Sequence, residues 1–378
     1  MPTDSSSEDP QRETRRRVLD RAVRIGLGAS VFSDAFLREG VALEDPHGVT
    51  PATREAIARG LRWLAGRQTA DGAFGDRGAY AGNVGVAALC GTAFLCAGGV
   101  RSRWADIVTR CTGYLVSRAQ PGGFIVEEEV RTHGPMYGHG FAVAYLSQVL
   151  GAEEGAGLAP GGSRVAAVLR KGVELILSAQ DEQGAWRYTP FPDDSDVSVT
   201  TCQLIALLSA RGAGISVPRE VIDRGVGFVM SCQNPDGGFR YRVKDPPESL
   251  WPRSAAAVVA LAQAGREVAA GAAGGGAAVR RGVRYLERGP RGTPLPRQAE
   301  YFYYGRFYEA QVVWREGAAA WGRWFPAVRE ELLVMQLGDG RWGDLQIGDE
   351  YATAMALMVL QMPENVVPML SRGGGGAS

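Results

Sequence analysis

The sequence predicts an all-α protein, a closed barrel of six inner and six outer helices. Two observations predict it. A unit of about 50 residues recurs six times along the 378-residue chain. Within each unit, a helix with one charged face precedes a helix that is small or apolar on most sides. Because a helix without a broad polar face must be buried, the second helices are expected inside and the first helices outside. A linear solenoid is the alternative architecture.

Each unit follows the same order of elements. The first helix ends at a glutamine, a turn with Asp-Gly or Gly-Gly allows positive φ, and an aromatic residue closes the turn. This pattern occurs at residues 68–74, 120–124, 180–186, 233–239 and 336–342, with a worn copy at 282–286. The inner helices are expected over residues 84–97, 140–150, 197–210, 254–264, 307–314 and 351–362.

The composition is typical of a soluble globular protein, with 45% hydrophobic and 22% charged residues. Basic and acidic residues number 41 each, so the zero net charge gives no reason to expect nucleic acid as a partner. No apolar run reaches the length of a transmembrane helix. The five cysteines include no Cys-x-x-Cys pair and fit a reducing compartment. We therefore expect a cytoplasmic protein without a cofactor.

Three segments are expected along the chain. Residues 1–48 form a partly disordered tail with a short basic helix, residues 49–370 form the helical domain, and residues 371–378 form a flexible, glycine-rich tail. Arg15-Arg16-Arg17 resembles the start of a twin-arginine export signal, which makes export the alternative location. Charged residues interrupt the apolar stretch that should follow, and this favours the cytoplasm.

Several motifs carry a family resemblance. Residues 336–342, Gln-x-x-Asp-Gly-x-Trp, resemble the QW motif of squalene and oxidosqualene cyclases, and residues 233–239 resemble the same element in prenyltransferase β subunits. Residues 196–203 look like the repeat that follows such motifs in bacterial squalene-cyclase-like proteins. The resemblance covers about residues 50–370 and implies an α/α toroid. It does not choose an activity, because that fold hosts cyclases, prenyltransferases and non-catalytic domains.

The resemblance implies a candidate acid. Class II terpene cyclases use an Asp-x-Asp-Asp motif whose third residue protonates an alkene or epoxide, and Asp194-Ser195-Asp196 matches its first three positions. Asp196 would be the proton donor, although the fourth position is Val197 rather than Asp. In the alternative, Asp194 or Ser195 caps the following helix and its dipole stabilises Asp196. His139, flanked by glycines, could orient the acid or a substrate oxygen, or bond a loop carbonyl.

Polar and aromatic residues at the starts of the inner helices are expected to meet at one mouth of the barrel. Aromatic faces stabilise carbocations, so these side chains are candidates for substrate binding, with core packing as the alternative. The candidates are Tyr137, Trp251, Tyr303, Tyr304, Tyr308 and Tyr351. Arg253 could bind a carboxylate or phosphate, or pair with Asp194 or Asp196.

The zinc site of the prenyltransferases is not expected here. The family that the sequence resembles binds zinc through Asp-x-Cys and a His one repeat later, whereas this chain has Ser198 and Arg253 at those positions. Thiolate and imidazole are the ligands that zinc prefers, and Ser and Arg do not replace them. The sequence therefore predicts no catalytic metal.

Taken together, these features predict a squalene-cyclase-like barrel with an apolar central cavity for an isoprenoid or similar lipid. Acid-initiated cyclisation or isomerisation is the first hypothesis for its activity. The alternatives are a non-catalytic toroid that binds a ligand or a protein, a zinc-free prenyltransferase-like enzyme, and a polysaccharide-active barrel. The last would need paired carboxylates, for which Glu309, Asp349 and Glu350 are the rim candidates beside the 193–196 group.

Overall fold

The computed structural model describes residues 47–75, 78–132, 134–155, 164–191, 194–267, 275–289, 301–364 and 366–371. Residues 1–46 of the expected N-terminal tail lie outside the described residues. So do Asp193, nearly all of the glycine-rich insertion at 155–162, most of the stretch at 269–278, and residues 372–378. The chain divides after Asp45, and the fold below is that of the second unit.

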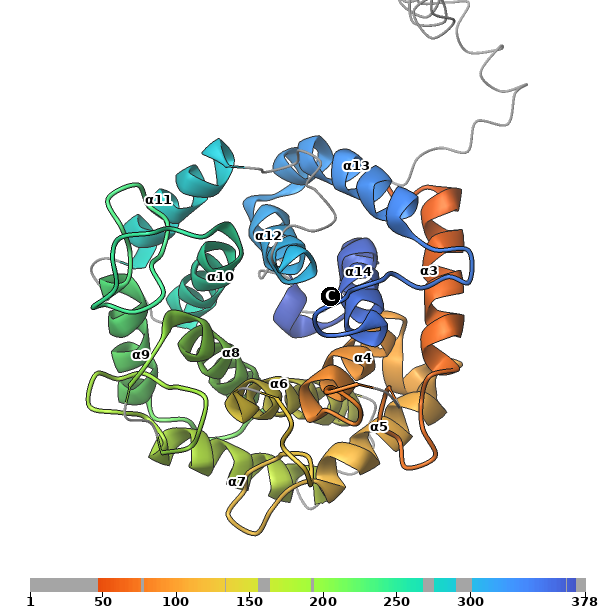
Figure 1. Ribbon diagram of the computed structural model, residues 1–378, viewed down its shortest axis with the longest axis horizontal. Helices are drawn as coiled ribbons and strands as arrows, with labels where there is room; N and C mark the ends of the chain where they lie inside the picture. Colours follow the sequence, from red (N-terminus) through yellow and green to blue (C-terminus); the bar gives the residue numbers. More distant parts are fainter. Residues whose placement is uncertain are drawn as a thin grey trace, which may run out of the picture. The chain divides into compact units, whose positions relative to one another are not determined.

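Twelve α-helices of the described residues form two concentric rings (Figure 1). The outer ring consists of α3 (Pro51–Ala65), α5 (Ala105–Ser117), α7 (Arg164–Ser178), α9 (Arg219–Ser231), α11 (Gly275–Arg288) and α13 (Ala318–Met335). The inner ring consists of α4 (Val84–Cys96), α6 (Pro135–Gly155), α8 (Val197–Gly212), α10 (Trp251–Glu267), α12 (Phe302–Glu316) and α14 (Asp349–Gln361). The predicted all-α architecture, an α/α toroid, is confirmed.

The ring is closed. Each inner helix packs against its two neighbours in chain order, and α14 also packs against α4. In the outer ring, α13 returns to α3. A linear solenoid would leave its first and last units apart, so these two contacts exclude it.

The recurring glutamine is a joint between neighbouring units. Gln336 Nε2 donates to the carbonyl of Gly340 in its own turn (2.8 Å) and to the carbonyl of Ala56 in α3 (2.9 Å). This pair of bonds therefore ties the last turn to the first outer helix. The same two bonds, to the turn glycine and to the next outer helix, recur at Gln68, Gln180 and Gln233. The sequence period thus reflects one joint found in four units. In the second unit the expected place of Gln120 was wrong, because Ala119 pairs with Ile125 as Gln68 pairs with Phe74.

The turn after each joint requires glycine. Gly123 has φ 90°, and a Cβ atom on it would lie 2.2 Å from the carbonyl oxygen of Lys171 in α7. Positive φ and a backbone contact with the next outer helix recur at the turn glycines 72, 184, 237 and 340. Each turn thus packs so closely against the backbone of the next outer helix that no side chain larger than the hydrogen of glycine fits.

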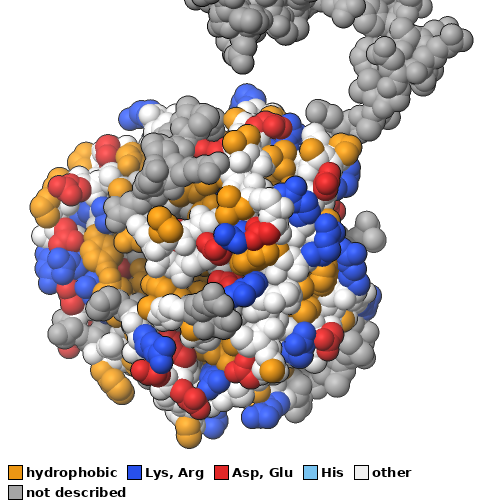
Figure 2. Space-filling view, turned by 45° about the vertical axis from the view of Figure 1, so that its right-hand side comes forward, with side chains coloured by type: hydrophobic (Ala, Val, Ile, Leu, Met, Phe, Trp, Pro, Cys, Tyr) orange, Lys and Arg blue, Asp and Glu red, His pale blue; other side chains and the backbone are white. Residues whose placement is uncertain are grey.

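Three inner helices begin earlier than the apolar pattern indicated: α6 at Pro135 rather than 140, α10 at Trp251 rather than 254, and α12 at Phe302 rather than 307. Pro135 and Pro252 lie in the first turns of α6 and α10, where a missing N–H has no cost. None of the described helices combines the length and apolarity needed to cross a membrane. On the side shown in Figure 2, charges of both signs are interspersed with hydrophobic side chains.

The end of the described chain enters the ring. After α14, the chain passes through the short helices η2 (Met362–Glu364) and η3 (Pro368–Leu370), and Figure 1 shows this segment inside the circle of inner helices. Met369 and Leu370 lie against residues of the lumen, including Phe141 and Tyr308. The C-terminal ends of the inner helices thus surround a short segment of the chain itself.

Candidate functional site

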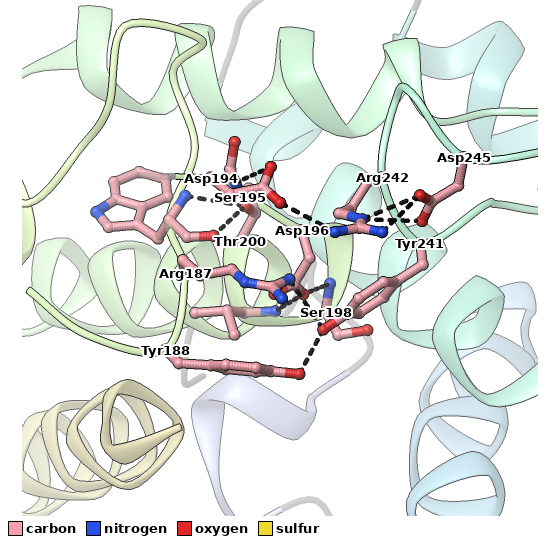
Figure 3. Close-up of polar contacts among 12 residues, drawn as sticks. Arg187, Tyr188, Asp194, Ser195, Asp196, Ser198, Thr200, Tyr241, Arg242 and Asp245 are labelled. Atoms are coloured by element: carbon pink, nitrogen blue, oxygen red, sulfur yellow. Dashed lines mark hydrogen bonds and ion pairs between the residues drawn. The ribbon is translucent and has the colours of Figure 1, made fainter. Parts of the chain in front are cut away.

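Asp196 directly precedes α8, so it lies on the face of the ring where the outer helices lead into the inner ones. Figure 3 shows its contacts. Its carboxylate is fully buried. Oδ1 accepts hydrogen bonds from the N–H groups of Ser198 (2.8 Å) and Val199 (2.9 Å), so Asp196 itself is the N-cap. The expectation that Asp194 or Ser195 caps this helix was wrong, because the extended backbone that a cap needs occurs at Asp196.

The second oxygen of Asp196 faces a cluster of basic and aromatic side chains. Arg187 Nη1 donates to Oδ2 (3.0 Å) and to the hydroxyl of Tyr241 (3.1 Å). The guanidinium lies over the Tyr188 ring, 4.4 Å from its centroid, and the Tyr188 and Tyr241 hydroxyls hydrogen-bond to each other. Both oxygens of Asp196 are therefore occupied by donors of the protein itself.

Sequence reasoning missed Arg187, Tyr188 and Tyr241. A signal for them existed, because the aromatic that closes the turn is followed by Arg-Tyr in two successive units, at 186–188 and at 239–241. Tyr188 belongs to the turn that precedes Asp196 in the same unit, whereas Tyr241 reaches Asp196 from the turn of the next unit. The hydrogen bond between the Val197 N–H and the Tyr241 carbonyl (2.9 Å) fixes this arrangement.

Two opposing effects act on the Asp196 carboxyl. Burial raises its pKa above the usual range, because the charged form loses its hydration. Three donors lower the pKa of Asp196, since each interacts favourably with the carboxylate: the Val199 N–H, Arg187 and the Ser198 N–H. A proton donor must carry a proton at rest, whereas these donors all stabilise the anion.

Asp194 has different partners from Asp196. Its carboxylate forms ion pairs with Arg242 (3.0 Å) and Lys244 (3.2 Å), and Arg242 also binds Asp245. Partial burial acts to raise the pKa of Asp194, but the Ser195 N–H and the two cations outweigh it and lower the pKa below its usual value. The two aspartates thus face separate cations.

His139 lies between the rings, where both of its nitrogens are used. Nδ1 accepts from the Ile125 N–H (3.1 Å), and Nε2 faces the Gly172 carbonyl (3.0 Å), which makes Nε2 the protonated nitrogen. In three other units, the backbone N–H at the same position of the turn donates to a hydroxyl of the inner helix instead. These hydroxyls belong to Thr200, Ser254 and Thr353. His139 thus fastens the turn of the second unit to its inner helix. The carbonyl that His139 binds belongs to helix α7 and not to a loop as expected, and neither of its two bonds is to Asp196.

The buried His139 predicts a pH effect on stability. Burial lowers its pKa from 6.5 to about 4, so between these values the unfolded chain binds more protons than the folded one. Stability should therefore fall as the pH falls from about 6.5 to 4, by up to roughly 3 kcal/mol from this group. His139→Thr, which copies the hydroxyl of the other units, should remove that part of the slope. Urea titrations of both proteins across this range measure it, and parallel curves would contradict the prediction.

Four of the predicted tyrosines do meet at the start of the inner ring. Tyr137 of α6 packs against Tyr188, with centroids 6.2 Å apart, and burial followed by the charge of Asp196 raises its pKa. Tyr304 and Tyr308 of α12 pack at 4.7 Å. Burial raises the pKa of Tyr351 in α14, with a further contribution from Tyr304. Tyrosines from three inner helices, α6, α12 and α14, thus cluster near Asp196, the N-cap of the fourth, α8.

The remaining predicted residues, Arg253, Trp251 and Tyr303, all contact other groups of the protein. Arg253 donates to the backbone carbonyls of Phe239 (3.0 Å) and Glu248 (3.1 Å). It forms an ion pair with neither aspartate, so the expected pairing was wrong, because Arg187 and Arg242 lie closer. The Trp251 indole points to Glu309 (3.4 Å), between α10 and α12. Tyr303 is buried and donates to the Gly343 carbonyl (3.3 Å).

The other rim carboxylates do not converge on one cavity. Each pairs with a different arginine: Glu309 with Arg306 of its own helix, Glu350 with Arg67, and Asp349 with Arg341. The polysaccharide hypothesis needs two carboxylates across one site, so this arrangement disfavours it. Among the described residues, no group of three His, Cys, Asp or Glu side chains is placed to hold a metal ion.

The lumen is narrow and mostly apolar. A cavity of about 20 Å³ lies among Leu89, Phe141, Ile205, Phe307 and Tyr308. This volume admits about one water molecule, whereas ligand pockets usually exceed roughly 300 Å³. A larger cavity of about 190 Å³ lies beside it, toward the C-terminal ends of the inner helices.

Comparison with known proteins supports the fold and leaves the activity open. No family model and no curated protein matches the sequence. Among solved structures, a D-mannose isomerase is similar with a TM-score of 0.58 and 12% identity, over 82% of this chain and 97% of that chain. The type II terpene cyclase MstE from Scytonema is similar with a TM-score of 0.56 and 15% identity, over 85% of this chain and 100% of that chain.

A glycosidase is also similar, with a TM-score of 0.53 and 15% identity, over 84% of this chain and 98% of that chain. These proteins share the α/α-toroid architecture and carry out unrelated chemistry. At such identities the likeness shows the fold alone, and function must be argued from the site.

Proposed function

We propose that this chain is a non-catalytic toroid that binds a hydrophobic, isoprenoid-like ligand in its lumen. The main support is the state of Asp196, whose oxygens accept two backbone N–H bonds and an ion pair with Arg187. A carboxylate held in this way serves as a structural anchor for α8. The lining of the lumen, which is apolar apart from a few amides and hydroxyls, suits a ligand with a hydrocarbon body. Because the cavity of about 20 Å³ admits only about one water molecule, binding requires that side chains of the lumen or residues 366–371 move aside.

Exposed apolar side chains on the loops support a hydrophobic ligand. Each of the five loops that lead from α5, α7, α9, α11 and α13 into the next inner helix carries an exposed large hydrophobic residue, namely Val130, Phe191, Val243, Tyr301 and Leu345. A single exposed hydrophobic residue is common on a soluble protein, so the support comes from the recurrence of one on each of these five loops. Their position, on the face where Asp196 and the tyrosine cluster lie, supports entry of an apolar molecule from this side.

Acid-initiated cyclisation or isomerisation of a polyprenyl chain is the second candidate. It is favoured by the burial of Asp196, which raises the pKa of its carboxyl, and by the aromatic cluster around it, since aromatic faces stabilise carbocations. The terpene cyclase MstE was solved with a geranylgeranyl dihydroxybenzoate substrate. In this candidate, a ligand that displaces Arg187 would leave Asp196 free to hold a proton.

Ligand binding separates these proposals from a scaffold without a ligand. Farnesol and geranylgeraniol should bind with a saturable, one-to-one isotherm in calorimetry. Phe141→Asn, which adds a polar group at the lumen, should weaken binding at least roughly tenfold, or about 1.4 kcal/mol. Tyr285→Asn, in the outer helix α11, is the matched control and should bind normally. Failure of the wild type to bind either alcohol would contradict the proposal, and product formation would favour the second candidate.

A further inference from the structure

The segment that enters the ring is held as a bound peptide would be. The N–H of Met369 donates to Gln148 Oε1 (3.2 Å). Its carbonyl accepts from Gln263 Nε2 (3.0 Å) and Arg315 Nη2 (2.9 Å). The three side chains that bind the backbone of Met369 belong to three inner helices, α6, α10 and α12. Three inner helices thus recognise both polar groups of a single backbone position.

Apolar contacts complete the recognition of the segment. Leu370 is 4% exposed and Val367 is 3% exposed, although both follow the last helix of the ring. Leu370 contacts the lumen, and the Met369 sulfur lies 3.9 Å from the Ser209 hydroxyl of α8. Residues 368–370 form the short helix η3, so the ring holds a single helical turn by its backbone groups and its apolar side chains.

The segment fills this site incompletely. The cavity of about 190 Å³ remains between Pro368 and Met369 on one side and the ends of α6, α8, α10 and α12 on the other. Its lining includes Ser147, Gln148 and Ser209, which are polar and buried. Gln263 and Met369 border both this cavity and the small cavity of the lumen. Departure of the segment would therefore join the two spaces and open the lumen at this end.

We propose that the C-terminal ends of the inner helices form a binding site for a short apolar peptide, which residues 366–371 occupy as a displaceable plug. The ligand class is a short helical turn with one backbone position clamped at both its N–H and its carbonyl, followed by a buried aliphatic side chain. The plug closes the lumen at the end opposite Asp196. This inference goes beyond the proposed function and does not depend on what the lumen binds.

Hydrogen exchange of the unaltered protein tests the plug directly. The amides of Met369 and Leu370 should exchange at least roughly tenfold faster than those of Leu357 and Val359 in the neighbouring α14, because a plug opens without unfolding the ring. Equal rates for the two sets would show that the segment is an integral part of the core, and would overturn the proposal.

Substitution within the plug gives the second test. Leu370→Asp should release the segment, and the protein should then take up one equivalent of the apolar dye 1-anilinonaphthalene-8-sulfonate. Val366→Asp, at a position that is 49% exposed in the same segment, should behave like the wild type. A synthetic peptide of residues 364–371 should displace the dye from the Leu370→Asp protein, and the same peptide with Leu370→Asp should not.

Circular dichroism checks that the Leu370→Asp protein keeps its helical content. Dye uptake that the wild-type peptide fails to reverse would overturn the proposal. If Leu370→Asp does not fold, Gln263→Ala, which removes one clamp on the Met369 carbonyl, should still speed exchange at Met369, and unchanged exchange would count against the site. None of these measurements uses an isoprenoid, so their failure is distinguishable from failure of the proposed function.

Discussion

Replacing Gly123 with alanine is expected to lower the free energy of unfolding by about 3 kcal/mol or more. The residue has φ 90°, which costs an L side chain of order 1 kcal/mol, and its Cβ would lie 2.2 Å from the Lys171 carbonyl oxygen. The contact is with the backbone of α7, so relief requires two outer helices to separate. Because the ring is closed, that separation must strain the neighbouring joints as well. Urea unfolding followed by circular dichroism measures the change.

The adjacent glycine provides the control. Gly122 does not have positive φ, and a Cβ on it would meet nothing within 4 Å. Gly122→Ala should therefore change stability by less than about 0.5 kcal/mol. Similar losses for the two variants would show that the close approach of turn and helix is not what requires glycine here.

The second large effect concerns Asp196. Asp196→Ala removes the cap of α8 and the partner of Arg187, so we expect a loss of about 2–4 kcal/mol. The arginine is 20% exposed and can recover part of its hydration, which keeps the loss below that of a wholly buried pair. Asp196→Asn keeps an oxygen for the cap and should cost only about 1 kcal/mol. Melting curves of both variants give these values.

The same variants decide between anchor and acid. If Asp196 is the anchor of α8, the Asn variant should bind farnesol and geranylgeraniol as the wild type does, and neither protein should form a cyclised product. If Asp196 is a proton donor, the wild type should form product and the Asn variant should lose that activity by several orders of magnitude. Asp194→Asn, which weakens a partly exposed ion-pair network, is the control and should change stability by less than about 1 kcal/mol.

The sequence was sufficient for the architecture because the architecture is a sum of local rules. The Gln-turn-aromatic copies specify joints at Gln68, Gln180, Gln233 and Gln336, and such joints between apolar helix pairs lead to a ring. The cap at Asp196 was harder to assign, since Asp194, Ser195 and Asp196 are all favoured capping residues and only the backbone dihedrals distinguish them. A local pattern thus identifies the helix start to within a few residues.

The partners in the site could not be read in the same way. Arg187 and Tyr241 reach Asp196 from two different turns, and nothing in the spacing of a single unit places them together. The small volume of the lumen could not be predicted either, because it depends on where Met369 and Leu370 lie after the last repeat has ended. Repeat analysis describes what the units share, whereas these features come from what differs between units.

The joint from Gln336 to α3 has a consequence for how such a chain can change in evolution. A linear array of repeats can gain or lose a unit at either end, because each unit contacts only its neighbours. Here the last unit is already the neighbour of the first, through the bonds of Gln336 to Ala56 and Gly340. Loss of one unit would require every remaining joint to adopt a sharper angle at once. Length variation in this protein should therefore be confined to its loops and ends, while the number of helix pairs stays fixed.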